Sequence, residues 1–515
     1  MYLTQGLHRS LRHTPQQAAT IFGDRVRSYV DHADRVARLA GGLRTLGVSD
    51  GERVAILSLN SDRYAELLVA VPWADGVLNP VNIRWSPEEI VYSLSDSETS
   101  VLVVDDTFAP MVRRLAEGHP GLTSVVHAGD GPAPDGAVAY EELVAGSAPI
   151  PDARRGGDDL AGVFYTGGTT GFPKGVLLSH TNLLTSALGG QATSSIVAPG
   201  GRLLHVAPMF HLADIAAWIG QSMVGGTHVV VPAFDAVAVL AAIDQHRVTN
   251  TVVVPTMIQM LVDHPDRDAY DLSSLRSVTY GASPITEALL QRAMKAFPQA
   301  DFVQAYGMTE LGPIATVLTP DDHRSGHRLG SAGRAAAHAE VRIVDGAGNE
   351  VPRGTVGEIA VRGGHVMAGY RGKPEETAEA LRDGWMHTGD GAYMDDEGYV
   401  FVVDRLKDMI VSGGENVYSV EVENALGRHP AVAACAVIGV PDTTWGERVH
   451  AVVVLRPGAD ATLDELRDHT QGLIGSYKAP RSVEFADGLP VSGAGKVLKR
   501  ELRAPYWSEA QRSVN

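Results

Sequence analysis

The sequence predicts an α/β protein with a large N-terminal domain and a small C-terminal domain. The chain has 515 residues, which is too long for a single hydrophobic core. Its first part alternates helical patterns with short β-branched runs, as layered α/β subdomains do. Near residue 330 the pattern changes to closely spaced hairpins, and a new unit begins after residue 404. We therefore expect layered α/β subdomains with a β-rich portion, followed by a small α+β domain.

Individual stretches in the first part support this order of elements. Residues 29–47 carry apolar side chains at helical spacing and end in glycine, a common helix stop. The runs "RVAILS" (53–58) and "TSVLVVDD" (99–106) are typical of buried strands. The runs "GTHVVVPAF", "NTVVVPTMIQMLV" and "LRSVTYGAS" continue the alternation of strand and helix. Such alternation predicts parallel sheets covered by helices.

The second part predicts hairpins and then a separate domain. Residues 339–363 contain two β-branched runs with glycine and asparagine between them, which indicates a hairpin. The remaining residues hold enough helix and strand patterns for a domain with its own core. We expect an N-terminal domain over 1–403, a hinge over 404–407 and a C-terminal domain over 408–515.

Composition excludes several classes of function. The formal net charge of −18 argues against a nucleic-acid-binding surface. A single cysteine, Cys435, excludes a disulfide framework and suits a reducing cytoplasm. The first residues lack the apolar stretch of a signal peptide, and no apolar run reaches the ~20 residues of a membrane span. We expect a cytoplasmic protein, with a weakly held homodimer as its oligomeric state.

The stretch "FYTGGTTGFPKG" (164–175) is the strongest local indication of chemistry. Only seven lysines occur in the chain, and Lys174 is one of them. The spacing differs from a P-loop, which needs G-x-x-x-x-G-K-[ST], because Gly175 follows the lysine. The stretch still offers phosphate ligands, since its glycines expose backbone N–H groups and its threonines add hydroxyls. The run "GVLLSH" that follows is typical of a strand, which places the loop between strands.

These residues, read with four later motifs, resemble the adenylate-forming superfamily, in particular its acyl-CoA synthetases for fatty or aryl acids. The first motif is "YTGGTTGFPKGVLLSH". The others follow in the expected order: "YGMTE" (306–310), "GWMHTGD" (384–390), "DRLKDMIVSGGENVYSVEVE" (404–423) and "LPVSGAGKVLKREL" (489–502). The resemblance covers nearly the whole chain. It implies that the C-terminal domain is mobile and rotates between two half-reactions.

The resemblance implies that a carboxylic acid first reacts with ATP to give acyl-AMP, and that coenzyme A then displaces AMP. ATP, Mg²⁺ and coenzyme A are the implied cofactors. An anionic acid must approach an anionic phosphate, so cations and N–H dipoles are needed around the α-phosphate. The resemblance assigns the nucleotide and metal contacts to Thr166, Gly167, Gly168, Thr169, Thr170, Gly171, Lys174, Gly281, Ala282, Ser283, Tyr306, Gly307, Thr309, Glu310, Asp390 and Arg405.

Within that set, the resemblance also implies individual roles, and the chemistry of each side chain suits its role. Glu310, with Thr169, would hold Mg²⁺, a hard cation that prefers oxygen ligands. Asp390 would accept both ribose hydroxyls, Tyr306 would lie against the adenine and Thr309 would touch the α-phosphate.

Two lysines and a glycine pair in the last two motifs carry the implied catalytic cycle. Lys496 resembles the mobile catalytic lysine that bridges the acid and the α-phosphate. Lys407 resembles the hinge residue, whose backbone turns when the domain rotates. Gly413 and Gly414 would line the tunnel for the pantetheine arm, because glycine permits a close approach.

The identity of the acid depends on weaker indications. His211 stands where adenylation domains for amino acids usually have aspartate, which argues against an amino acid; Asp214 is a weaker rival for that role. The other expected contacts with the acyl group are Trp218, Met308 and Ile314, besides the small residues 281–283. These side chains are neutral, so we expect a fatty, aryl or polycyclic acid and no dicarboxylate.

Three alternatives and two departures from the family pattern stay open. The acceptor is either free coenzyme A or the phosphopantetheine of an acyl carrier protein, and the enzyme is either competent in both half-reactions or in one. A binding protein without catalysis is the third alternative. Gly167 replaces a serine that many relatives have, and Ser419 replaces a proline.

Overall fold

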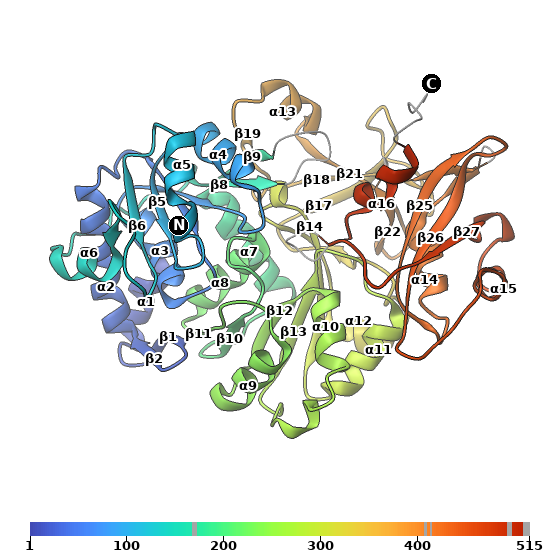
Figure 1. Ribbon diagram of the computed structural model, residues 1–515, viewed down its shortest axis with the longest axis horizontal. Helices are drawn as coiled ribbons and strands as arrows, with labels where there is room; N and C mark the ends of the chain where they lie inside the picture. The colour runs from blue at the N-terminus through green and yellow to red at the C-terminus, as the bar shows by residue number, and fades with distance from the viewer. Residues whose placement is uncertain (167–172, 406–408, 413–414, 492–496, 508–515) are drawn as a thin grey trace.

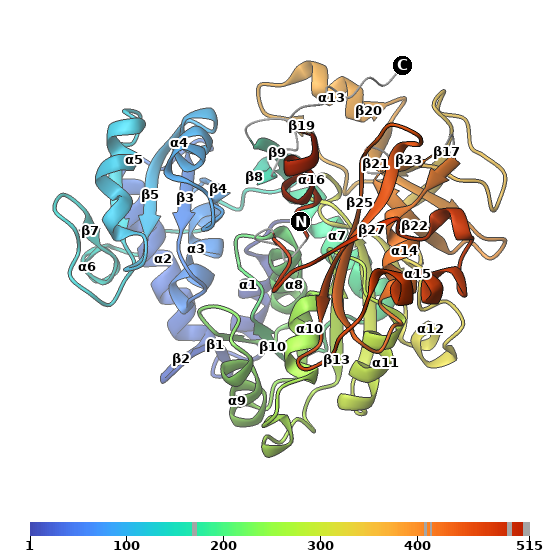
Figure 2. The ribbon, with the colours of Figure 1, turned by 45° about the vertical axis from the view of Figure 1, so that its right-hand side comes forward.

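The computed structural model describes residues 1–166, 173–405, 409–412, 415–491 and 497–507. Figures 1 and 2 show a large N-terminal region of helix-covered sheets, with the C-terminal strands and helices standing beside it. Among the described residues, none of the helices combines the length and the apolar character needed to cross a bilayer.

The first sheet has eight strands and a mostly parallel core. Its order is β19-β9-β8-β4-β3-β5-β6-β7. Strands β8, β4, β3, β5, β6 and β7 run parallel, whereas β9 and β19 are antiparallel to their neighbours. The bounds are β3 Arg53–Leu57, β4 Val77–Pro80, β5 Thr99–Val104, β6 Ser124–His127, β7 Val138–Ala139, β8 Leu160–Thr166, β9 Lys174–Ser179 and β19 Gly369–Tyr370.

The second sheet has nine strands in the order β16-β15-β14-β13-β12-β10-β11-β1-β2. The strands from β14 to β1 are parallel, and antiparallel strands close both edges. The bounds are β1 Ala18–Phe22, β2 Arg25–Ser28, β10 Arg202–His205, β11 Thr227–Val230, β12 Asn250–Val253, β13 Ser277–Gly281, β14 Asp301–Gly307, β15 Ile314–Leu318 and β16 Arg334–Ala335.

Helices cover these two sheets: α2, α3 and α8 contribute to the largest core, α9, α10 and α11 to a second one, and α4 and α5 to a smaller one. Their bounds are α1 Gln5–His13, α2 Tyr29–Thr45, α3 Asp62–Trp73, α4 Pro87–Asp96, α5 Val112–Gly118, α6 Tyr140–Gly146, α7 His180–Ser194, α8 Leu212–Val224, α9 Ala236–His246, α10 Pro255–Val262, α11 Glu287–Ala296, α12 Pro320–Ser325 and α13 Pro374–Ala380. Short 3₁₀ turns are η1 Ala109–Met111, η2 Arg267–Ala269, η3 Thr309–Leu311 and η4 Ser476–Lys478.

Helix α2 illustrates why the sequence folds as predicted. Ser28 caps its N-terminus, because its side chain accepts from the backbone of Asp31 while Asp31 reaches back in a capping box. Its buried residues recur at helical spacing, and the chain leaves the helix at Gly47, whose φ is +95°. The predicted helix and the strands at 53–58 and 99–106 are therefore confirmed.

The third sheet is the predicted β-rich portion. It is antiparallel, with the order β17-β18-β21-β20, and β22 pairs with β21. The bounds are β17 Glu340–Val344, β18 Gly357–Arg362, β20 Leu381–Arg382, β21 Trp385–Met394 and β22 Val400–Arg405. The expected hairpin over 339–363 is the β17–β18 pair, in which Glu340 lies opposite Arg362.

The C-terminal domain has its own sheet and its own core. The sheet order is β24-β23-β26-β25, with β27 beside β26. Twelve buried residues between Ile410 and Leu466 form a core separate from the large one. The bounds are β23 Ile410–Ser412, β24 Glu415–Val417, β25 Val432–Asp442, β26 Gly446–Leu455, β27 Ser482–Phe485, α14 Ser419–Leu426, α15 Leu463–Gln471 and α16 Lys499–Trp507. The predicted fold class is confirmed; the boundaries at 403 and 407 remain predictions.

One described ion pair joins the C-terminal domain to the large domain. Arg428, just after α14, lies 3.2 Å from the carboxylate of Glu287 at the start of α11. Both side chains are about half exposed, so this pair alone contributes little to the stability of the contact.

Candidate active site

Asp390 lies near the middle of β21, with its carboxylate held in place by a tyrosine. Tyr306, on β14, donates a 2.7 Å hydrogen bond from its hydroxyl to Oδ2 of Asp390. The backbone N–H of Asp390 donates to the hydroxyl of Thr388, and Asp390 is only 7% exposed. Across the β21–β22 pair its register partner is Arg405. The structure therefore brings together three residues that the sequence assigned to the nucleoside, although they come from separate motifs.

Glu310 and Lys174 are brought together by a residue that the sequence analysis did not single out. Tyr370, on β19, donates a 2.8 Å hydrogen bond from its hydroxyl to Oε1 of Glu310. The ammonium of Lys174 lies 4.9 Å from the centre of the Tyr370 ring. Strand β19 pairs with β9, which places Tyr370 beside Val176, two residues after the lysine. One aromatic side chain thus contacts both the predicted phosphate lysine and the predicted metal carboxylate.

The turn from β14 to β15 fixes Thr309 and Glu310. Gly307 and Ile314 are register partners across the two strands. A Cβ on Gly307 would lie 1.8 Å from the carbonyl oxygen of Pro313, so a side chain has no room there. The short 3₁₀ turn at Thr309 therefore projects from a tight, fixed hairpin.

Residues 281–283 lie beside that hairpin. Gly281 ends β13 and is the register partner of Ala305 on β14. A Cβ on Gly281 would lie 2.2 Å from the carbonyl oxygen of Ala305, and Ala282 has a φ of +65°. The carboxyl ends of neighbouring parallel strands share one edge, where ligands of α/β sheets bind. The predicted contacts Ala282 and Ser283 follow β13 at the edge where β14 ends, one residue after Tyr306.

The glycine-rich loop connects β8 to β9, as expected for a loop between strands. Thr166 and Lys174 face each other as the last register pair of this antiparallel hairpin. Gly167, Gly168, Thr169, Thr170 and Gly171 lie outside the described residues, as do Lys407, Gly413, Gly414 and Lys496. Their roles remain predictions.

His211 and Ile314, two of the expected contacts of the acyl group, both lie near helix α8. His211 precedes α8, with its ring 4.2 Å from that of Phe210. Ile314 packs in a small core with Ala217 of the same helix. Met308, the N-cap residue of η3, packs partly buried against the large core.

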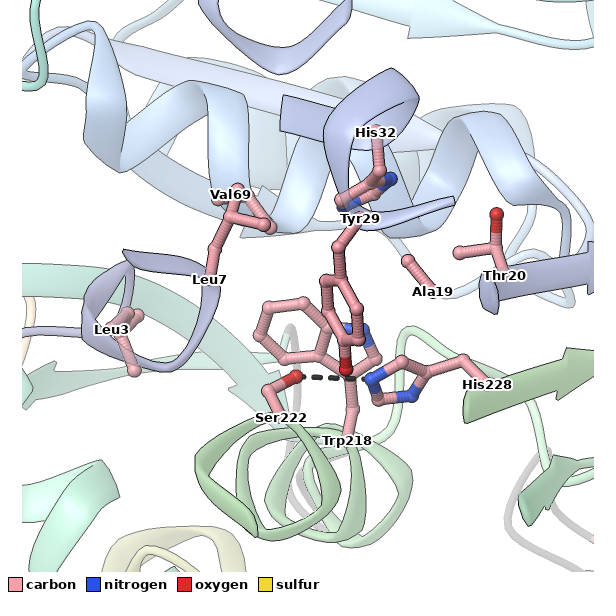
Figure 3. A pocket seen from close by; sticks show the side chains of 10 residues that line it. All are labelled: Leu3, Leu7, Ala19, Thr20, Tyr29, His32, Val69, Trp218, Ser222 and His228. Atoms are coloured by element: carbon pink, nitrogen blue, oxygen red, sulfur yellow. Dashed lines mark hydrogen bonds between the residues drawn. The ribbon is translucent and has the colours of Figure 1, made fainter. Parts of the chain in front are cut away.

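Asp214 and Trp218 have other partners. Asp214 is 1% exposed and lies 2.8 Å from Nδ1 of His205, so its carboxylate already has an internal partner. The Trp218 ring stacks on His228 and lines a cavity between α1, α2 and α8 (Figure 3). That cavity encloses about 20 Å³, room for about one water molecule and none for an acyl chain. Because the carboxylate of Asp214 is already bonded to His205, it is not free to pair with the amino group of an amino-acid substrate. Because Trp218 faces this small cavity, we do not include it in the proposed acyl pocket.

Comparison with known proteins places the chain in a family. A family model for the AMP-binding enzymes matches residues 7–371, and a model for their C-terminal domain matches 421–496. The chain is 43% identical over 499 residues to a feruloyl-CoA synthase of an Amycolatopsis species, covering 97% of this chain and 98% of that protein. It is 37% identical over 514 residues to the fatty acid–[acyl-carrier-protein] ligase ScoC of Streptomyces coeruleorubidus, covering 98% and 96%.

A solved structure agrees with these relatives. The anthranilate CoA ligase AuaEII, in complex with anthranoyl-AMP, superposes with a TM-score of 0.92 at 27% identity, covering 98% of this chain and 97% of that one. The chain belongs to the AMP-binding enzymes, the adenylate-forming superfamily that its motifs resemble. Within that class it is an AMP-forming acid–CoA ligase, as predicted.

Replacing Tyr370 with phenylalanine is expected to raise the KM for ATP about tenfold and to leave the KM for the acid unchanged. The change removes the hydrogen bond to Glu310 and keeps the ring beside Lys174. A hydrogen bond to a charged group contributes about 1.5–3 kcal/mol, which corresponds to a tenfold effect or more. Steady-state pyrophosphate release, with each substrate varied in turn, measures both constants.

Tyr140→Phe is the matched control, because Tyr140 donates an equally short 2.8 Å bond to the buried Glu66 on α3. It should change thermal stability without changing the KM for ATP. Equal changes of that constant in the two variants would contradict a specific role for Tyr370.

Proposed function

We propose that the enzyme converts an aryl or hydroxycinnamate-like carboxylic acid to its acyl-AMP and then to the acyl-CoA thioester. The main support for ATP binding comes from two carboxylates that tyrosine hydroxyls hold in place by hydrogen bonds. Tyr306 bonds to Asp390, and Tyr370, beside Lys174, bonds to Glu310. In this proposal Asp390 accepts the ribose hydroxyls, and Lys174 with the glycine-rich loop holds the β- and γ-phosphates. The carboxylate of an acid then meets a phosphate already neutralised by fixed charges.

The residues present suit Mg²⁺ at the phosphate end. Glu310 offers carboxylate oxygens, the donor type that Mg²⁺ prefers, and it is held at one oxygen by Tyr370. Thr169 is the proposed second ligand. When bound, the ion would lower the charge of the phosphates; Glu310 and Tyr370 would orient it.

The side chains of the proposed acid site favour a substrate that carries no charge other than its reacting carboxylate. His211 and Phe210 form an aromatic pair before α8, and Met308 and Ile314 are apolar. Asp214 has an internal partner, which removes the carboxylate that an amino acid would need. The 43% identity to a feruloyl-CoA synthase supports ferulate as the first acid to test, with medium-chain fatty acids next.

Free coenzyme A is the proposed acceptor. With a net charge of −18, the chain offers little attraction for an acidic carrier protein. A cytoplasmic location and a weak homodimer complete the proposal; the single cysteine supports the first.

Separate assays of the two half-reactions over a panel of acids test this proposal. We expect pyrophosphate release with ferulate or octanoate and none with malonate or phenylalanine, because the pocket offers no charged partner for either extra group. Thioester should then form with coenzyme A. Thioester with a phosphopantetheinylated carrier protein alone would instead assign the carrier as acceptor, and no pyrophosphate with any acid would overturn the proposed activity.

A further inference from the structure

The segment 206–211, which connects β10 to α8, has an unusual environment for a connecting segment. It carries Phe210 and His211, yet Val206, Ala207, Met209 and Phe210 are all buried. Connecting segments normally run over the surface, because buried backbone N–H and C=O groups need partners. The partners of this segment therefore determine how rigidly His211 is held.

Asn60 supplies two of those partners from the other sheet. It follows β3, is 3% exposed, and lies about 150 residues away in sequence from the segment. Its amide nitrogen donates a 2.9 Å bond to the carbonyl oxygen of Ala207. The backbone N–H of Met209 donates a 2.7 Å bond to its Oδ1. One side-chain amide thus satisfies a donor and an acceptor two residues apart, which fixes both its own orientation and that of the segment.

Asn60 is itself held at the junction of the two sheets. Its backbone N–H donates a 3.1 Å bond to the carbonyl oxygen of Pro232, which follows β11. The amide therefore has little freedom to move with the segment, and it links the eight-stranded sheet to the nine-stranded one at this point.

A second side-chain contact joins the two elements that flank the segment. His205 ends β10 and Asp214 lies in the first turn of α8; their side chains meet at 2.8 Å in full burial. The other nitrogen of His205 lies 2.9 Å from Nδ1 of His228 on β11. The last member of this series of side-chain contacts is Ser222, two helical turns after Asp214 on α8. Its hydroxyl lies 3.1 Å from Nε2 of His228 (Figure 3).

With both imidazole rings neutral, these contacts have one consistent order of donors. A carboxylate only accepts, so His205 donates from Nδ1 to Asp214 and accepts at Nε2 from His228. His228 then accepts at Nε2 from the hydroxyl of Ser222. Burial lowers the pKa of His228 well below its usual value, which agrees with a neutral His228 ring in this series of hydrogen bonds. Helix α8 is thereby held against β10 and β11 over two turns.

We propose that Asn60 is a positioning residue of the acid site: its amide, with the His205–Asp214 pair, fixes segment 206–211 so that His211 is held against the acyl group. This inference rests on the proposed function, in which His211 contacts the acid. A small displacement of a substrate-contacting group lowers binding and rate strongly. The nucleotide contacts Tyr306, Glu310 and Asp390 lie on other elements, so they should be unaffected.

The test compares Asn60→Ala with Asn79→Ala by calorimetry. Asn79 is a fully buried amide in the same sheet, bonded to Ser97 and Thr99, and controls for the loss of a buried amide. The probes are feruloyl- and octanoyl-sulfamoyladenosine, which occupy the acid and nucleotide sites, and AMP alone. We expect Asn60→Ala to raise the Kd of the better-bound acyl probe about tenfold or more and to leave the Kd of AMP unchanged; Asn79→Ala should change neither.

Hydrogen exchange provides a readout that does not depend on a ligand. In Asn60→Ala the amide of Met209 should exchange faster, together with its neighbours in 206–211. Asn60→Gln keeps both the donor and the acceptor of the amide and shifts them by one methylene, so it should give smaller effects and serves if the alanine variant does not fold.

Each outcome separates the two proposals. Unchanged exchange in 206–211, or equal weakening of acyl probe and AMP, would overturn the role of Asn60 while the ligase function stands. A wild-type enzyme that binds AMP but neither acyl probe would overturn the proposed acid site, and the assignment of Asn60 to it as well.

Discussion

Replacing Lys496 with alanine is expected to lower acid-dependent pyrophosphate release by about 10²–10³-fold, because one preorganised charge opposite the transferring phosphate contributes that much to catalysis. The motif "LPVSGAGKVLKREL" resembles the segment that carries the mobile lysine of the adenylate-forming enzymes. Its charge would lie between the attacking carboxylate and the α-phosphate, two anions that otherwise repel each other. The assay supplies acid, ATP and Mg²⁺ without coenzyme A.

The second half-reaction distinguishes this role from a general loss of structure. Given synthetic acyl-AMP and coenzyme A, Lys496→Ala should form thioester at a rate within a few fold of the wild type. Lys295→Ala is the matched control, since Lys295 is an exposed lysine in the last turn of α11. Equal losses in both half-reactions would remove Lys496 from the proposed role.

Replacing Lys407 with proline should produce the opposite pattern. Proline fixes φ near −65° and so removes the backbone freedom that a rotating hinge needs. Pyrophosphate release should stay within a few fold of the wild type, whereas thioester formation from acyl-AMP should fall by about 10²-fold or more, because we expect the tunnel for coenzyme A to form only after rotation.

Lys407→Ala separates the backbone effect from the loss of charge. Alanine removes the ammonium group and keeps the rotation, so this variant should retain most of its thioester formation. If the alanine and proline variants lost the same activity, the charge of Lys407 would matter and its backbone would not. Together the Lys496 and Lys407 pairs assign each half-reaction to a different residue of the C-terminal part.

The contiguous motifs explain why several residues of the proposed nucleotide site could be expected to lie together. Thr166 and Lys174 lie close in sequence and face each other across one hairpin, and Glu310 lies in the 3₁₀ turn directly after the strand that carries Tyr306. Short-range geometry keeps such residues together in almost any context, so their spacing carries chemical information. The prediction that the loop lies between strands followed from the β-branched run after Lys174 and is confirmed by β9.

Trp218 shows that the direction in which a helical side chain points cannot be read from its position in the sequence. It is expected in the acyl pocket as one of several small or apolar side chains, but a helix presents successive side chains to different sides. The structure turns Trp218 towards His228 and a cavity of about 20 Å³, while Ala217 faces the core that contains Ile314. The sequence predicts the helix, but the packing of its neighbours determines what each of its faces contacts.

The sequence by itself determined the α/β architecture, the superfamily and the order of its motifs, because hydrophobic periodicity and the spacing within a motif are local properties. Only the tertiary structure decided that Tyr370 contacts both Lys174 and Glu310. It also decided that Asp214 pairs with His205, and that Asn60 bonds to the segment before His211. The contacts of Tyr370 with Glu310 and of Asn60 with Met209 span 60 and 149 residues. Such partners are chosen by the packing of separate elements, which no local pattern records.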